Sequence, residues 1–122
     1  MNELGFFKNW EAVEEYIRKG APRPKKLDGL KDPDGEPWIR FPDAIEDGVL
    51  LEAKNGRQSL SAHIKKQIEK DVAAREQGII TDAEWHFFPS VAGDKGKVSI
   101  GPSAPLLAAL KENNIKVIIH AP

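Results

Sequence analysis

The chain has 122 residues, of which 40% are hydrophobic and 30% are charged, a composition that predicts one globular domain with a single core and excludes a disordered or fibrous protein. It contains no cysteine, which excludes disulfides, thiolate metal sites and a cysteine nucleophile, and no apolar run approaches the roughly 20 residues of a membrane helix. The net charge of −1 lacks the basic excess typical of nucleic-acid-binding proteins, and residues 1–10 lack the basic and apolar regions of a signal peptide.

The first predicted element is an amphipathic helix over residues 9–19. Val13 and Ile17 belong to an apolar stripe at helical spacing, and Gly20 ends the pattern. Residues 20–37 are rich in proline and glycine, so they predict an irregular connection.

Two strands are predicted next, at residues 38–41 and 49–54. Pro42 closes the first of them, because proline has no N–H group to donate to a strand ladder. The interval between the two strands is short and contains a turn signal at 46–48, so we expect them to pair antiparallel.

The second half of the chain alternates helices with strands. We expect helices at 59–77 and 104–114, strands at 83–90 and 115–120, and a Gly-rich loop or an added hairpin at 91–103. Strands that alternate with helices are typical of α/β proteins. The predicted fold is therefore an α/β fold with a mixed central sheet and helices on both faces.

The end of the predicted strand 49–54 carries two charges. Because side chains alternate along a strand, Glu52 and Lys54 are expected on one face. Asp43 follows the preceding strand and is expected at the same end of the pair. Two converging carboxylates would suit a hard divalent cation such as Mg²⁺, which stabilises charge on a phosphodiester and acidifies bound water. Lys54 would then hold or activate that water, or contact the phosphate oxyanion.

Pro42-Asp43 followed by Glu52-Ala53-Lys54 resembles the motif of the PD-(D/E)XK nuclease superfamily. Residues 36–122, including "EWHFFPS" and "IKVIIHAP", look more specifically like the restriction-endonuclease-fold toxin domains of bacterial polymorphic toxins. The resemblance implies a restriction-endonuclease-like core over residues 36–122. The length of the chain predicts that this core forms one domain, residues 1–122, with the N-terminal helix and irregular connection at 1–35, to which the resemblance does not extend.

The function implied by this resemblance is a metal-dependent nuclease that uses Mg²⁺ or Mn²⁺, with DNA as the expected substrate. Such domains are secreted or delivered effectors that act in the cytoplasm of a competing bacterial cell. The expected partners are therefore the nucleic acid and a cognate immunity protein, and no membrane.

The resemblance also implies roles for particular residues. Asp43 and Glu52 would hold the metal, and Lys54 would be the catalytic lysine. Ala44 stands where the family usually has glycine, which leaves Asp47 as the alternative to Asp43 as a metal ligand.

An upstream acid often completes the metal site in this superfamily. Glu36 precedes Trp38 in the position of the family's Glu-Trp step and is the first candidate. Glu14 and Glu15, on the predicted first helix, are its competitors.

Three further polar residues are candidates to line the cleft. His63 and Gln67 are four residues apart and share a helix face, although an exposed polar flank explains them equally well. His86 matches the family's Trp-His-Phe step, and its alternative is a structural histidine.

Two functions from different classes follow. The first is the nuclease, with the basic stretches 18–31 and 65–70 tracking the phosphate backbone. The second is a non-catalytic protein-interaction domain, such as an immunity-like binder or a degenerate nuclease fold, which the near-neutral charge favours.

Overall fold

A four-stranded mixed sheet forms the centre of the molecule. The computed structural model describes residues 10–92 and 97–120. The strand order is β1-β2-β3-β6, with β1 antiparallel to β2 and the other two neighbouring pairs parallel. The strands are β1 (Ala44–Glu46), β2 (Val49–Asn55), β3 (Asp82–Phe88) and β6 (Lys116–Ile119).

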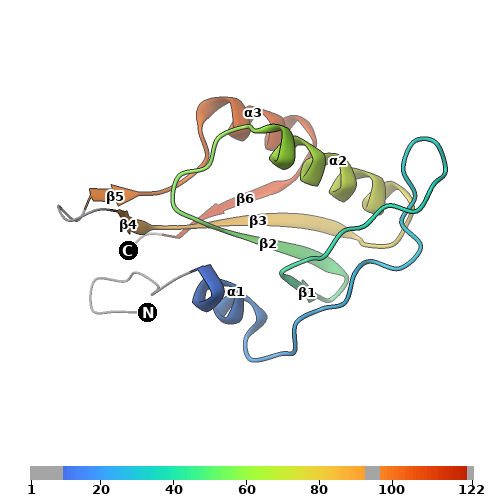
Figure 1. Cartoon of the computed structure of the whole chain (residues 1–122), viewed down its shortest axis with the longest axis horizontal. Coiled ribbons are helices and arrows are strands. Elements are labelled where there is room, and N and C mark those ends of the chain that lie inside the picture. The colour runs from blue at the N-terminus through green and yellow to red at the C-terminus, as the bar shows by residue number, and fades with distance from the viewer. Residues whose placement is uncertain (1–9, 93–96, 121–122) are drawn as a thin grey trace.

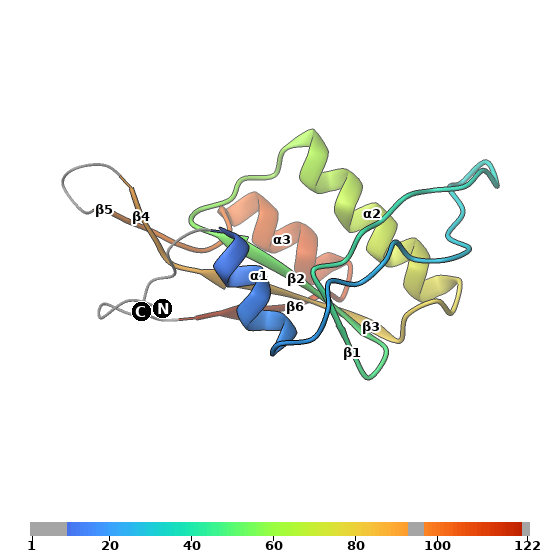
Figure 2. The same ribbon diagram turned by 60° about the horizontal axis from the view of Figure 1, so that its bottom comes forward.

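Helices cover both faces of this sheet. The three helices are α1 (Trp10–Arg18), α2 (Ala62–Glu76) and α3 (Ala104–Glu112). Figure 1 shows α2 and α3 on one face and α1 on the other, and Figure 2 shows α1 crossing in front of the strands. The predicted α/β class with a mixed sheet is therefore confirmed. No helix in the described part of the chain is both long and apolar enough to cross a bilayer.

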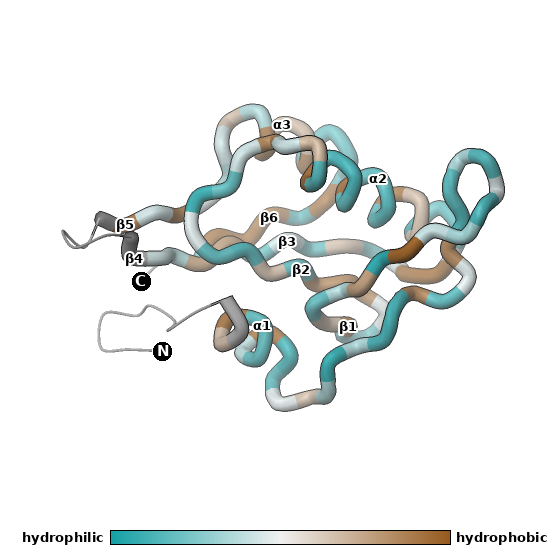
Figure 3. The backbone as a smooth tube through the Cα atoms, viewed as in Figure 1, coloured by the Kyte–Doolittle hydropathy of each residue, from teal (hydrophilic) through white to brown (hydrophobic). Residues whose placement is uncertain are grey.

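The core is divided between the two faces by the alternation of side chains along the strands. Leu50, Trp85 and Phe87 point towards α2 and α3 and join the large cluster of buried residues there. Leu51 points the other way and packs with Ile17 of α1 in a small second cluster. In Figure 3 the strands alternate between hydrophobic and hydrophilic colours, whereas the loop with the turn 32–36 is mostly teal.

Serine side chains set where the two later helices begin. The hydroxyl of Ser61 accepts a hydrogen bond from the Ile64 N–H (3.2 Å), and that of Ser103 accepts one from the Leu106 N–H (3.4 Å). The first of these caps places the start of α2 later than the predicted residue 59. The predicted start of the first helix, at residue 9, lies outside the described residues.

The predicted strand at 38–41 is wrong. That segment lies against residues 27–30, with the Leu27 N–H donating to the Arg40 carbonyl (2.8 Å), and the strand beside β2 is instead Ala44–Glu46. Asp47 and Gly48 both have positive φ (51° and 83°), so they form the kind of two-residue hairpin turn that pairs the residues directly beside it. This turn decides the register, and Pro42 keeps residues 38–41 out of the ladder.

The predicted strand at 83–90 is divided at Pro89. Its main part is β3, and the rest belongs to an antiparallel hairpin of β4 (Ser90–Ala92) and β5 (Lys97–Ser99). The hairpin alternative for residues 91–103 is therefore confirmed.

Candidate active site

Strand β2 carries Glu52 and Lys54 on the face that is covered by α2. Leu50, two residues earlier, is fully buried in the large core cluster on that side, so Glu52 and Lys54 continue the same row of side chains. Glu52 is 4% exposed. The predicted placement of the two charged side chains on one face with Leu50 is confirmed.

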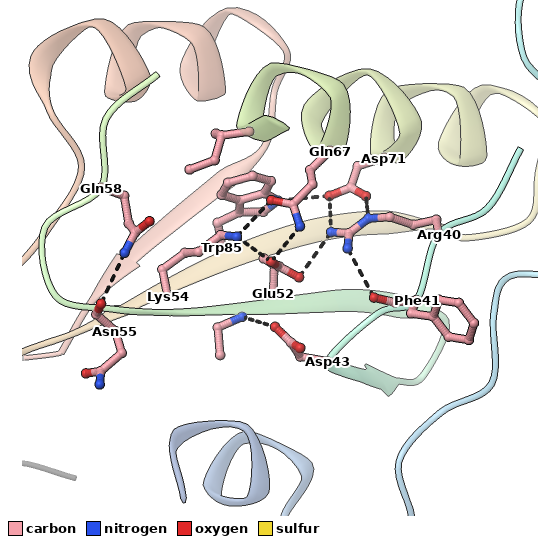
Figure 4. Close-up of polar contacts among 12 residues, drawn as sticks. Arg40, Phe41, Asp43, Glu52, Lys54, Asn55, Gln58, Gln67, Asp71 and Trp85 are labelled. Atoms are coloured by element: carbon pink, nitrogen blue, oxygen red, sulfur yellow. Dashed lines mark hydrogen bonds and ion pairs between the residues drawn. The ribbon is translucent and has the colours of Figure 1, made fainter. Parts of the chain in front are cut away.

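Glu52, Lys54 and Gln67 form a closed triangle of polar contacts (Figure 4). The Lys54 ammonium lies 2.8 Å from Glu52 Oε2 and donates to Gln67 Oε1 at 2.8 Å. The Gln67 amide donates in turn to Glu52 Oε2 at 3.3 Å. The lysine is therefore held by two groups and has little freedom to swing into solvent.

The other oxygen of Glu52 meets a buried ionic network. Arg40 Nη2 donates to Glu52 Oε1 (3.1 Å) and to Asp71 Oδ2 (3.3 Å), while Arg40 Nε donates to Asp71 Oδ1 (2.7 Å). Trp85 Nε1 also donates to Asp71 Oδ2 (2.8 Å). Arg40 is thus shared by two carboxylates beneath α2, a geometry that suits the planar guanidinium.

These contacts determine which groups are charged. Burial by itself would raise the pKa of Glu52, but the positive charges of Arg40 and Lys54 outweigh it and hold the pKa below its ordinary value. Burial raises the pKa of Asp71, and the donors of Arg40 and Trp85 act in the opposite direction. Burial would lower the pKa of Arg40, yet the two carboxylates raise it.

Asp43 lies at the edge of this cluster, immediately before β1. Its Oδ2 accepts a hydrogen bond from the Ala53 N–H at 2.8 Å (Figure 4). Burial, with the negative charge of Glu52 next, raises the pKa of Asp43 to about 8. The interaction is one-sided: the charge of Glu52 opposes the ionisation of Asp43, whereas the hydrogen bond with Asp43 helps to keep the pKa of Glu52 low.

Asp43 and Glu52 are the residues that would hold a divalent cation here, because carboxylate oxygens are the ligands that Mg²⁺ prefers. Asp43 would have to release its proton to bind the cation. Within residues 10–92 and 97–120, no three or more histidine, aspartate or glutamate side chains gather as a metal-binding group. The remaining coordination positions would therefore fall to water and to substrate oxygens.

Of the other acidic candidates, one lies near Asp43 and two are exposed away from the cluster. Glu14 on α1 is half buried, and its charge contributes to the raised pKa of Asp43. Glu15 is exposed. Asp47 is exposed in the hairpin turn that precedes β2, and the first three residues of that strand separate the turn from Glu52. The structure thus brings Asp43, rather than Asp47, to Glu52.

Glu36 lies outside the cluster. Its side chain is exposed, and its turn lies beyond the end of the sheet in Figure 1. Gln77, just after α2, holds the start of that turn through two hydrogen bonds with the backbone of Lys31 (3.0 and 2.8 Å). Gln67 is ten residues earlier in the chain, about 15 Å along a helix axis. The expectation that Glu36 completes the site is not supported by this geometry.

The two histidine candidates are not in the cluster either. His63 is exposed one turn before Gln67, so only Gln67 of that pair reaches Glu52. His86 pairs with Ala53 in the ladder between β2 and β3 and faces α1. Because Trp85 and Phe87 point towards α2 and α3, His86 lies on the opposite face from Glu52 and Lys54.

Arg40 and Asp71 are the two members of the cluster that sequence reasoning missed. Asp71 lies three residues after Ile68 and seven after Ile64, within the buried face of α2. An acidic side chain within an apolar helical stripe needs a buried partner. The position of Asp71 in that stripe could therefore have indicated a buried ion pair. Arg40 sits inside the apolar run "WIRF", but which acid it pairs with depends on how α2 packs over β2.

The pKa of Asp43 predicts how stability depends on pH. The folded-state value of about 8 lies above the ordinary value of 3.8, so the folded protein keeps a proton that the unfolded chain has released. The stability contributed by this proton is complete below the unfolded pKa and is lost as pH rises to about 8, by at most about 1.4 kcal/mol per pH unit.

The measurement compares urea unfolding of the wild type and Asp43→Asn, in EDTA, between about pH 6.5 and about pH 8.5. Only the wild type should lose stability across this range. Parallel curves for the two proteins would show that Asp43 does not retain its proton.

Comparison of the chain with known proteins does not assign it to a family. No family model, curated protein or solved structure matches the chain.

Proposed function

We propose that this chain is a metal-dependent nuclease that hydrolyses phosphodiester bonds, with DNA as the expected substrate. The observation that supports this most directly is the pairing of a held lysine with two neighbouring carboxyl groups: Lys54 is 2.8 Å from Glu52, whose charge helps to raise the pKa of Asp43. Phosphodiester hydrolysis needs both negative ligands for a cation and a positive group beside the reacting phosphate.

Each residue of the cluster has a role in this proposal. Asp43 and Glu52 would hold Mg²⁺ or Mn²⁺, which supplies charge neutralisation at the phosphate and an acidified water. Lys54 would orient that water or stabilise the oxyanion, and Gln67 is a positioning residue because it accepts from the Lys54 ammonium. Arg40 fixes the Glu52 carboxylate from the other side.

The proposed substrate is matched by basic and aromatic side chains on α2 and beside it. Lys66 and Lys70, one turn apart on the helix that carries Gln67, lie 5.7 and 5.8 Å from the centre of the Trp38 ring. Lysines at the rim of a site contact phosphates and make affinity fall with salt. Lys66 also forms an exposed ion pair with Glu69 (3.2 Å), so these lysines lie in a surface of mixed charge, as expected for a chain whose net charge is −1.

The wider setting of the proposal comes from the resemblance in the sequence. Under it the sheet is a restriction-endonuclease-like core, and the chain is a toxin domain delivered into the cytoplasm of competing bacteria and neutralised by an immunity protein. The four-stranded mixed sheet is an arrangement of α/β proteins in general and does not by itself distinguish that core.

One observation favours a second candidate, a non-catalytic member of the fold that binds a protein partner. Glu52 is 4% exposed and already contacts Arg40, Lys54 and Gln67, so its carboxylate is satisfied without a metal. A buried ion cluster of this kind also occurs as a purely structural feature.

The test that separates the two is metal removal. Purified chain is incubated with supercoiled plasmid and, separately, with RNA, in Mg²⁺, in Mn²⁺ or in EDTA. Nicking or linearisation of plasmid in the presence of metal, abolished by EDTA and restored by excess Mg²⁺, is the expected result. Intact plasmid and RNA under every condition would replace the nuclease by the interaction domain.

A further inference from the structure

Two histidines meet on the face of the sheet opposite Glu52. His86 Nδ1 and His120 Nε2 are 2.8 Å apart. His86 lies on β3, opposite Ile118 of β6, and His120 follows two residues later, so both side chains project from the same face. The contact joins residues that are 34 positions apart in the chain.

Neighbouring groups hold both rings in place. The ring of His120 is stacked on Phe88, with centroids 4.2 Å apart and planes inclined by 8°. His86 Nε2 lies 3.2 Å from Glu84 Oε1, and the His120 backbone N–H donates to the Phe87 carbonyl (2.9 Å). These contacts restrict the rotation of both rings, so the two nitrogens are held facing each other.

The pair is suited to remain neutral. Only one proton fits between the two facing nitrogens, so a doubly protonated pair would bring two N–H groups together. The charged groups around the pair are of both signs: Glu84, Glu46, Lys116 and Lys19.

We propose that His86 and His120 form a binding site for a transition-metal dication that prefers imidazole, such as Zn²⁺. Two nitrogens bound to one tetrahedral zinc at about 2.0–2.1 Å lie about 3.3 Å apart, so binding requires the facing nitrogens to move apart by about half an ångström and both rings to turn until their lone pairs meet at the metal. Glu84 then occupies the position of the carboxylate that orients a metal-bound histidine.

The remaining coordination positions open onto a pocket. This cavity of about 380 Å³ is lined by both histidines and by Lys19, Glu46 and Glu84. A water molecule or a small anionic ligand beside Lys19 would complete the coordination.

This site is separate from the proposed Mg²⁺ site in position and in chemistry. It lies across the sheet from Glu52 and does not depend on nuclease activity. Imidazole nitrogens favour zinc, copper and nickel, whereas carboxylate oxygens favour magnesium. Excess Mg²⁺ should therefore leave zinc binding unchanged.

The experiment is calorimetric titration of Zn²⁺ into the chain, free of any histidine tag, at about pH 7.5 with Mg²⁺ in excess. We expect one Zn²⁺ per chain, lost in both His86→Gln and His120→Gln. The third histidine, His63, is exposed on α2 and provides the matched control, so His63→Gln should bind zinc as the wild type does.

Two further measurements separate ligation from a structural role. Zinc should raise the melting temperature of the wild type and of His63→Gln but not that of His86→Gln or His120→Gln, each of which is compared with its own metal-free melting curve. Glu84→Gln should weaken zinc binding about tenfold. Zinc binding that survives in either His86→Gln or His120→Gln, or that is absent from the wild type at micromolar zinc, would overturn the proposal.

Discussion

Lys54→Met should reduce plasmid cleavage at least about 100-fold, the size of loss seen when one preorganised electrostatic group is removed from a transition state. The Lys54 ammonium lies 2.8 Å from Glu52 Oε2 and 2.8 Å from Gln67 Oε1. It is the positive member of the triangle formed by Glu52, Lys54 and Gln67, and methionine leaves that position without a charge. The loss should fall on kcat, because a group that acts on the reacting phosphate contributes little to ground-state affinity.

The control for this experiment is Lys111→Met. Lys111 is exposed in the last turn of α3, so its loss removes one positive charge without touching the cluster. Cleavage by this variant should stay within a few-fold of the wild type. If Lys54→Met retained more than a tenth of the activity, Lys54 would not be the catalytic lysine.

Arg40→Met should lower the free energy of unfolding by about 3–5 kcal/mol, the cost of leaving buried carboxylates without their cation. Arg40 is 4% exposed, and its guanidinium is the shared partner of Glu52 and Asp71. Methionine fills a similar volume, so the effect reports the lost charge rather than a cavity.

Urea unfolding at neutral pH measures this effect, with the surface ion pair as the matched control. Lys19 and Glu46 also form an ion pair (3.0 Å), but their side chains are 72% and 50% exposed. Lys19→Met should therefore cost only about 0–1 kcal/mol. Equal losses in the two variants would mean that the cluster around Arg40 is not a buried electrostatic unit.

The order of helices and strands was predictable because it is written in local periodicity. The apolar stripe of α2, the alternation of β2 and the turn before Val49 each depend on residues close together in the chain. The common face of Glu52 and Lys54 follows from strand geometry alone. The strand at 38–41 failed because "WIRF" has strand-like composition while the Asp47-Gly48 hairpin chose the residues that pair.

The composition of the polar clusters was not predictable in the same way. Asp71 and Arg40 are 31 residues apart and meet only because α2 packs beside the segment 38–41 that carries Arg40. His86 and His120 meet only because β3 and β6 are adjacent. The alternation of side chains along β3 places His86 on the face opposite Glu52 and Lys54, although its position between Trp85 and Phe87 had made it a candidate for their site.

By itself, the sequence determined the α/β class, the side of β2 on which Glu52 and Lys54 lie, and the absence of thiol chemistry. Only the tertiary structure decided that Asp43 and Gln67 join them, that Glu36 and His86 do not, and that Arg40 links the group to Asp71. The physical reason is that periodicity specifies which way a side chain points from its own element. Which charges meet is specified by the packing of elements, and a buried charge accepts only the partner that this packing provides.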